Sequence, residues 1–199
     1  MAGNLTPTTE LEAVNLMLGA IDAAPVNSLS GDNDLDVVQA LAILRQVNRE
    51  VQSIGWHFNT DRRYPLARNL AGNIVVPANI LSIDTSSDYQ DRDLSQRAGK
   101  MWDKANLSFT FTEDLTFDVT WFFEFTDIPE TARNYIALRA ARRFQNRRLG
   151  SDSLGNFTEK DEMEAYMIFK SAEGIEADYS ILDGDPTARM VVNRERHLW

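Results

Sequence analysis

The 199-residue sequence contains no cysteine and only two histidines, His57 and His197. Without cysteine the chain can form no disulfide, no thiolate nucleophile and no cysteine-ligated zinc or iron–sulfur site. Two histidines also exclude a multi-histidine metal site within one chain. We therefore expect no metal and no cofactor.

Basic residues are the minority, with 20 Lys and Arg against 30 Asp and Glu, so the formal charge is −10 and the pI is near 4.7. This balance argues against nucleic-acid binding as the main task, because such binding neutralises many phosphates. No apolar run approaches the ~20 residues that span a bilayer, and residues 1–10 lack a signal-peptide core. We expect a protein that contacts no membrane and is kept in a cytosol-like compartment or in an assembly built there.

Two helices are predicted near the start of the chain. Thr9 and Glu12 have the spacing of a capping box, and apolar residues at helical intervals extend the first helix over 9–23, before Pro25. The second helix is predicted over 34–54 and ends at Gly55. Its expected apolar stripe consists of Leu35, Val38, Leu41, Ala42, Leu44, Val47, Val51 and Ile54.

The pattern between residues 60 and 127 is that of β-strands. Short apolar runs at 74–76 and 80–83 flank Pro77, which forbids one continuous central strand. Over 107–123, large apolar side chains fall on odd positions and polar ones on even positions. This alternation predicts a hairpin with a turn near Glu113 and Asp114, which the earlier runs complete into a small antiparallel sandwich or barrel.

Helical spacing returns at Asp127. A third helix is predicted to about Leu149, and a fourth begins near Thr158. The fourth helix is expected to direct Met163, Tyr166, Met167, Phe169 and Ile175 inward.

The predicted fold class is therefore α+β. Residues 1–60 and 127–185 form a discontinuous bundle of four main helices, and 61–126 form an inserted antiparallel β domain. The tail, 186–199, is expected to dock on a partner through Leu198 and Trp199.

The third helix concentrates positive charge. Its arginines are Arg133, Arg139, Arg142, Arg143, Arg147 and Arg148. Arg139, Arg143 and Arg147 are spaced i, i+4, i+8 and share one stripe. They either pair with acids of the fourth helix, or contact another subunit or protein, where the planar guanidinium suits carboxylates. Direct DNA contact is a lesser third option. The candidate acids are Glu159, Asp161, Glu162 and Glu164.

No constellation favours catalysis strongly. The acid groups Asp32/Asp34/Asp36 and Asp183/Asp185 lie where a helix begins or a turn is expected, so capping explains them more simply than acid–base chemistry. His57, between Trp56 and Phe58, is predicted to pack beneath an aromatic corner rather than act as a base. No nucleophile elbow or phosphate-binding glycine loop is present.

Several ordered blocks of sequence carry a resemblance. They are 10–15 (ELEAVN), 25–29 (PVNSL), 52–60 (QSIGWHFNT), 128–130 (IPE), 135–136 (YI), 139–147 (RAARRFQNR) and 179–185 (YSILDGD). In this combination and order, the sequence resembles the tail tubular protein A family, the head-to-tail adaptors or gatekeepers of short-tailed bacteriophages (podophages). The resemblance extends over about residues 10–185.

The resemblance implies a structural role in the virion tail, assembled in the host cytoplasm. Members form a twelve-subunit ring below the portal protein and above the tail nozzle, which extends the DNA channel and helps seat tail fibres. DNA would pass through the lumen without specific binding, and the arginines would lie in subunit or portal contacts. The alternative from another class is a tail-associated glycan or cell-wall hydrolase that uses a carboxylate pair such as Asp32 with Asp36.

Overall fold

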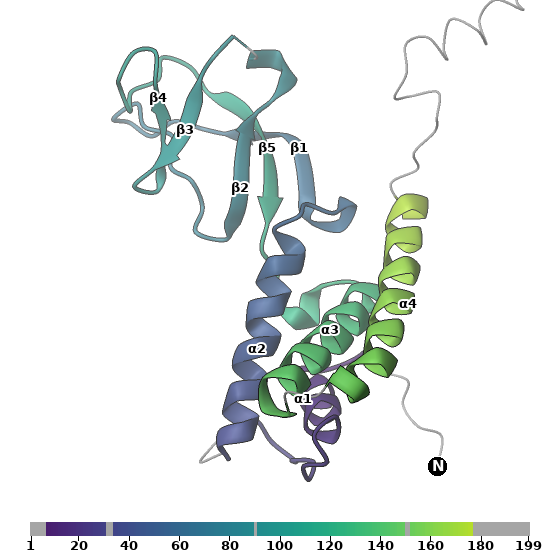
Figure 1. Ribbon diagram of the computed structural model, residues 1–199. Helices are drawn as coiled ribbons and strands as arrows, with labels where there is room; N and C mark the ends of the chain where they lie inside the picture. Colours follow the sequence, from purple (N-terminus) through teal and green to yellow (C-terminus); the bar gives the residue numbers. More distant parts are fainter. Residues whose placement is uncertain (1–6, 31–33, 90, 150–151, 177–199) are drawn as a thin grey trace, which may run out of the picture.

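The computed structural model describes residues 7–30, 34–89, 91–149 and 152–176. This part of the chain contains the helices α1 (Glu10–Gly19), α2 (Leu35–Gln52), α3 (Glu130–Leu149) and α4 (Asp152–Glu176). Between α2 and α3 lie the strands β1 (Thr60–Leu66), β2 (Ile80–Thr85), β3 (Leu94–Arg97), β4 (Lys100–Asp103) and β5 (Leu115–Trp121). The helices gather in one bundle, and the strands lie beyond the end of α2 (Figure 1). The predicted α+β class is confirmed.

Side-chain caps define the starts of the first two helices. Thr9 Oγ1 accepts the N–H of Glu12 at 3.2 Å and Glu12 Oε2 accepts the N–H of Thr9 at 2.8 Å, so the predicted capping box is present. Asp34 caps α2 by accepting the N–H of Leu35 at 2.8 Å. Helix α1 ends at Gly19, earlier than predicted, and Gly55 follows α2 with a φ of +80°, a conformation suited to glycine.

Helix α3 is the centre of the bundle, in contact with α1, α2 and α4. The largest buried apolar side chains of this core are Phe125, Phe144, Phe169, Met17, Leu18, Leu44 and Ile136. Phe169 also packs between Trp56 and Tyr135, with ring centroids 4.4 Å and 5.9 Å away. This aromatic cluster joins α4 to the segment that leaves α2.

The inward face of α4 differs from the prediction. Phe169 is buried and Tyr166 half-buried, but Met163, Met167 and Ile175 are exposed. Two glutamates, Glu162 and Glu173, are buried in their place because each has polar partners inside the fold. Apolar periodicity does not encode such pairs, so it was right for Phe169 and Tyr166 and wrong for the other three residues.

Two further predictions about the helices are corrected. Helix α4 begins at Asp152, before the predicted Thr158. Of the predicted stripe of α2, Leu44, Val47 and Val51 are buried, but Leu35, Val38 and Ala42 are exposed, as is Ile54, two residues beyond the end of the helix. The buried face of α2 consists of Val37, Ala40, Ile43, Leu44, Val47, Asn48, Val51 and Gln52.

Strand β5 is the middle strand of a three-stranded antiparallel sheet of order β1-β5-β2, and β3 and β4 form a separate hairpin. Leu115, Phe117 and Val119 of β5 are buried, as the alternation predicted. The predicted hairpin of 107–112 with 115–123 is wrong: β1 and β2 occupy both edges of β5, and 107–112 forms only isolated bridges. The hydrophobic cluster of this β unit is distinct from that of the bundle. That each part is a domain of its own stays a prediction.

Buried amides connect the bundle to the β unit. The side chain of Gln52, fully buried at the end of α2, donates to the carbonyl of Phe123 and accepts the N–H of the same residue, both at 2.8 Å. Asn59 donates to the carbonyls of Gln52 at 2.9 Å and Trp121 at 2.8 Å. These bonds hold the end of β5, where the chain returns to the bundle, against the segment after α2, where the chain leaves the bundle.

We predict that Gln52→Ala destabilises the protein by roughly 2–4 kcal/mol, because it removes a fully buried side chain, takes the acceptor from the N–H of Phe123, and leaves the carbonyl of Phe123 only the longer 3.4 Å bond from Asn48. Chemical denaturation followed by circular dichroism would measure the change. Gln46→Ala, an exposed position on the same helix, is the matched control and should cost much less. Equal losses in the two variants would contradict the prediction.

Candidate interface site on helix α3

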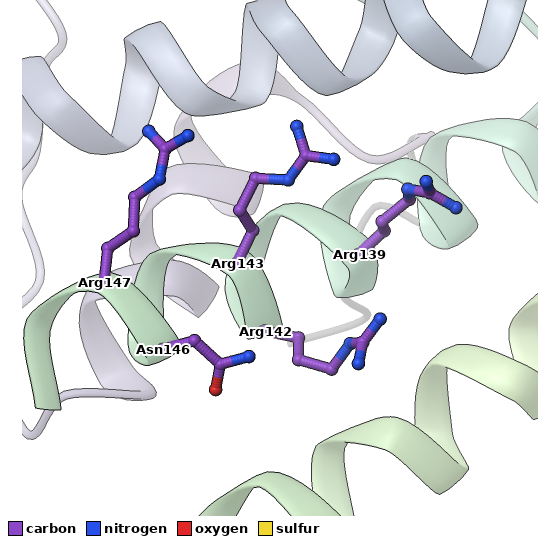
Figure 2. Close-up of a pocket in the computed structure, with 5 residues that line it drawn as sticks. All are labelled: Arg139, Arg142, Arg143, Asn146 and Arg147. Carbon is purple, nitrogen blue, oxygen red and sulfur yellow. The ribbon is translucent and has the colours of Figure 1, made fainter. Parts of the chain in front are cut away.

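Helix α3 presents its arginines to two neighbouring helices. Arg139, Arg143 and Arg147 follow one another at one-turn intervals on the side that faces α2, and Arg142 points toward α4 (Figure 2). With Asn146, these side chains line a hollow of about 280 Å³. We call this hollow the arginine groove.

Two ion pairs connect α3 to α2. Arg143 donates to Glu50 from both terminal guanidinium nitrogens, Nη1 to Oε1 at 2.9 Å and Nη2 to Oε2 at 2.7 Å. These bonds hold the pKa of Glu50 below its ordinary value and raise the pKa of Arg143. Nearer the end of α3, Arg148 pairs with Asp36.

A second set of pairs connects α3 to α4 through Glu162, which is 7% exposed. Arg142 donates its Nε–H to this carboxylate, and Arg139 lies 3.7 Å from it. Arg139 also donates to the hydroxyl of Tyr135 at 2.6 Å. Two guanidinium groups thus lie against the carboxylate of Glu162, and their positive charges offset the free-energy cost of burying its negative charge.

Arg133, unlike the other arginines of α3, binds backbone carbonyls. Its guanidinium donates to the backbone carbonyls of Ile128 at 2.8 Å, Thr8 at 3.1 Å and Thr126. Thr8 in turn donates to Glu130 from its N–H at 2.8 Å and from its hydroxyl at 2.5 Å. Arg133 therefore fixes the segment before α1 against the start of α3.

Arg147 is the exception among the six. It is exposed, and no ion pair or hydrogen bond joins its side chain to any residue in the described ranges. It lies at one end of the arginine groove, beyond Arg143 (Figure 2). Its charge is therefore the one most open to a partner.

The arginines of α3 were predicted either to pair with acids of α4 or to contact another subunit. Pairing with α4 is observed for Glu162 and, at 4.0 Å from Arg142, for Glu159. No such pair is made by Asp161 or Glu164 within the described ranges. Glu50 and Asp36 were not predicted as partners, because α3 lies between α2 and α4 and only the tertiary fold brings α2 to its arginines. The contact of these arginines with another subunit stays a prediction.

The remaining candidate residues do not form a catalytic group in the described chain. Asp34 is a helix cap, Asp36 is paired with Arg148, and His57 is exposed rather than packed beneath the aromatic rings. Asp32, Asp183, Asp185, Leu198 and Trp199 lie outside the described residues.

Among the described residues, no group of His, Asp and Glu side chains is placed to hold a metal ion. Nor does any helix in the same ranges combine the length and hydropathy needed to cross a bilayer.

A polar contact that the sequence did not reveal joins α4 to the segment after α2. Glu173, 6% exposed, accepts the backbone N–H of His57 at 2.6 Å and of Phe58 at 3.4 Å. Burial raises the pKa of Glu173, and the two N–H bonds oppose the shift.

The chain is an α+β protein whose helices are linked by arginine ion pairs, and comparison with known proteins gives its family. A family model described as tail tubular protein matches residues 11–179, so the chain belongs to the tail tubular protein family. Tail tubular protein A of Klebsiella phage KP34 is 26% identical over 163 residues, which cover 81% of this chain and 85% of that protein. The chain is a structural component of a phage tail.

We predict that Glu173→Gln changes the pH dependence of stability. Because the folded-state pKa is raised above about 4.5, the carboxyl group stabilises the fold most below that pH, and its contribution is lost as pH rises through the folded pKa. Glutamine keeps an acceptor for both N–H groups and cannot ionise. The free energy of unfolding of the variant, relative to the parent chain, should therefore increase between about pH 4 and pH 7.

Urea denaturation across this range would measure the difference, with Glu164→Gln, at an exposed position of the same helix, as the control. A difference between Glu173→Gln and the parent chain that does not vary with pH would count against the prediction.

Proposed function

We propose that the chain is the head-to-tail adaptor of a short-tailed phage: about twelve copies form a ring that docks on the portal protein above and receives the nozzle protein below. The ring extends the DNA channel for retention and ejection of the genome and helps seat the tail fibres. It has no catalytic turnover and assembles in the host cytoplasm. Membership in the tail tubular protein family over residues 11–179 is the observation that carries this proposal.

The architecture is compatible with a connecting role. The β unit and the bundle carry separate hydrophobic clusters, and the strands extend beyond one end of α2 (Figure 1). Two chemically different ends allow one protomer to meet two different partners. The buried amides of Gln52 and Asn59 hold the two parts in a defined relation.

The arginine groove is proposed as part of a contact with a neighbouring subunit or the portal. Arg139, Arg142 and Arg143 are already partly neutralised by Glu50 and Glu162. Arg147 adds a charge with no partner in the described chain, so a carboxylate from outside would complete the set. The tail residues Leu198 and Trp199 are proposed as further anchors on a partner.

The net charge suits a channel through which DNA slides. Each copy carries a formal charge of −10, so a ring has a large negative total. Acidic walls repel phosphates, and four arginines of α3 (Arg139, Arg142, Arg143 and Arg148) are engaged with carboxylates of the bundle instead of being free to bind DNA. Passage without specific binding follows from this distribution.

The purified chain mixed with the portal protein of the same phage should give a closed ring on the portal, with about twelve copies by native mass measurement and electron microscopy. DNA-filled heads that lack the chain should lose their genome, and added chain should prevent the loss. A chain that stays monomeric and leaves the portal unoccupied would overturn the proposal. So would release of sugars from host surface glycans by the purified chain, since this would favour the hydrolase.

We predict that Arg147→Glu weakens docking on the portal or on a neighbouring subunit while stability changes by less than about 0.5 kcal/mol, because Arg147 is exposed and makes no ion pair in the described chain. Arg143→Glu should reduce both docking and stability, since it also breaks the bidentate pair with Glu50. Arg62→Glu, at an exposed position of β1, is the charge-matched control. Sedimentation of portal mixtures measures docking, and normal docking of Arg147→Glu would remove Arg147 from the interface.

A further inference from the structure

The outer face of α2 is apolar in its first half. Leu35 and Val38 are 62% and 54% exposed, and Ala42, one turn further on, is exposed as well. These residues lie on one stripe of the helix, opposite the buried positions Ala40, Leu44 and Val47. Large apolar side chains in a continuous exposed stripe mark a surface that associates with something else.

The outer face of α4 is apolar too. Met163 and Met167, one turn apart, are 60% and 59% exposed, and Ile168 and Ile175 are 52% and 77% exposed. The helix binds its own bundle through the opposite face, with Glu162, Ala165 and Phe169. Methionine is flexible and polarisable, and it adapts to the contour of a partner.

The two outer faces lie on opposite sides of the bundle. Helix α3 packs against both α2 and α4 and lies between them (Figure 1). Neither outer face can therefore cover the other within one protomer. Two different association surfaces on opposite sides of one chain are what a head-to-tail ring requires, whereas a two-fold dimer needs one self-complementary surface.

The charges around the two apolar stripes are complementary. The exposed charges of α2 are Arg45, which lies 3.5 Å from Glu10 of α1, and Arg49, which has no ion pair in the described ranges; the acids Asp36 and Glu50 are paired with α3. On α4, the charged residues that are not buried are the acids Glu159, Asp161, Glu164 and Glu176 and the bases Lys160 and Lys170. Glu159 lies 4.0 Å from Arg142. Without the paired charges, α2 keeps Arg49, and α4 keeps the acids Asp161, Glu164 and Glu176 against the bases Lys160 and Lys170, so the remaining charges of the two faces are opposite in sign.

We propose that the outer face of α4 of one copy packs on the outer face of α2 of the next copy, and that this contact closes the ring. The occupant of each face is a second copy of this chain. Pairing of two α2 faces is disfavoured, because it would bring the unpaired charge of Arg49 toward its equivalent. The inference rests on the proposed ring and deepens it, since it names the two surfaces that repeat around it.

The absence of cysteine allows a direct test, because single cysteines can be placed without a background of native thiols. Ala42→Cys marks the α2 face and Met167→Cys marks the α4 face; both positions are exposed, so neither change disturbs the core. Rings assembled on the portal are treated with a short bismaleimide and separated on a denaturing gel. Val75→Cys, 51% exposed in the β unit, replaces Ala42→Cys in the control pair.

The chain that carries both cysteines should give a ladder of covalent oligomers. A mixture of the two single variants should give dimers and nothing larger, and each single variant alone should remain a monomer. Contact within the ring raises the effective concentration of the two thiols, so the yield of the mixed dimer should exceed that of the Val75→Cys control by roughly tenfold or more.

The negative outcomes distinguish a wrong assignment of the two faces from a wrong adaptor function. Rings that form but do not crosslink through Ala42→Cys and Met167→Cys overturn the assignment of the faces and leave the adaptor function standing. Dimers from one single variant alone overturn it too, since they show like faces in contact. Crosslinks from Met167→Cys to the portal protein place a different occupant on α4 and overturn it as well. Failure of the parent chain to form any ring counts against the proposed function itself.

Discussion

The amide of Gln52 is the contact on which the arrangement of the whole molecule depends. A carboxamide carries a donor and an acceptor, so one buried side chain satisfies both backbone groups of Phe123, the residue at which the chain returns from the β unit. The side-chain amide of Asn59 adds two bonds at the same junction by donating to the carbonyls of Gln52 and Trp121. Because unpaired amides are costly in a buried site, this junction tolerates few alternative geometries. It places the β unit at one end of the bundle, so the two ends of the protomer differ in structure.

The bundle itself is held across its central helix by charge as well as by apolar packing. Arginines of α3 reach Glu50 and Asp36 on α2 and Glu162 on α4, so three helices share one set of pairs. Most of the positive charge that the sequence concentrates on α3 is thereby neutralised within the protomer. What remains for a partner is the arginine groove with Arg147, and the two apolar faces on the outer sides of α2 and α4. A structural tail protein needs this combination of a rigid protomer and uncovered, dissimilar surfaces.

The elements that depend on local sequence were predictable. The capping box of Thr9, the cap of Asp34 and the alternation over 115–121 report short-range physics, and each is present. The pairing of strands was not predictable, because β5 exchanges hydrogen bonds with β1 and β2 from distant parts of the chain, and β1 has no alternation that identifies it. Six arginines on one helix could be read from the sequence, but only one group of their partners was foreseen.

By itself, the sequence determined the class of the fold, the helices and their caps, the absence of thiol chemistry and the arginine-rich third helix, because these follow from residue type and spacing. The ordered blocks of sequence also indicated the family. Only the tertiary structure decided which face of each helix is covered. Glu162 and Glu173 point inward since partners from α3 and from the segment after α2 meet them there. Met163 and Met167 are left outside for the same reason, because burial depends on what other segments bring to a position and not on the hydrophobicity of the residue alone.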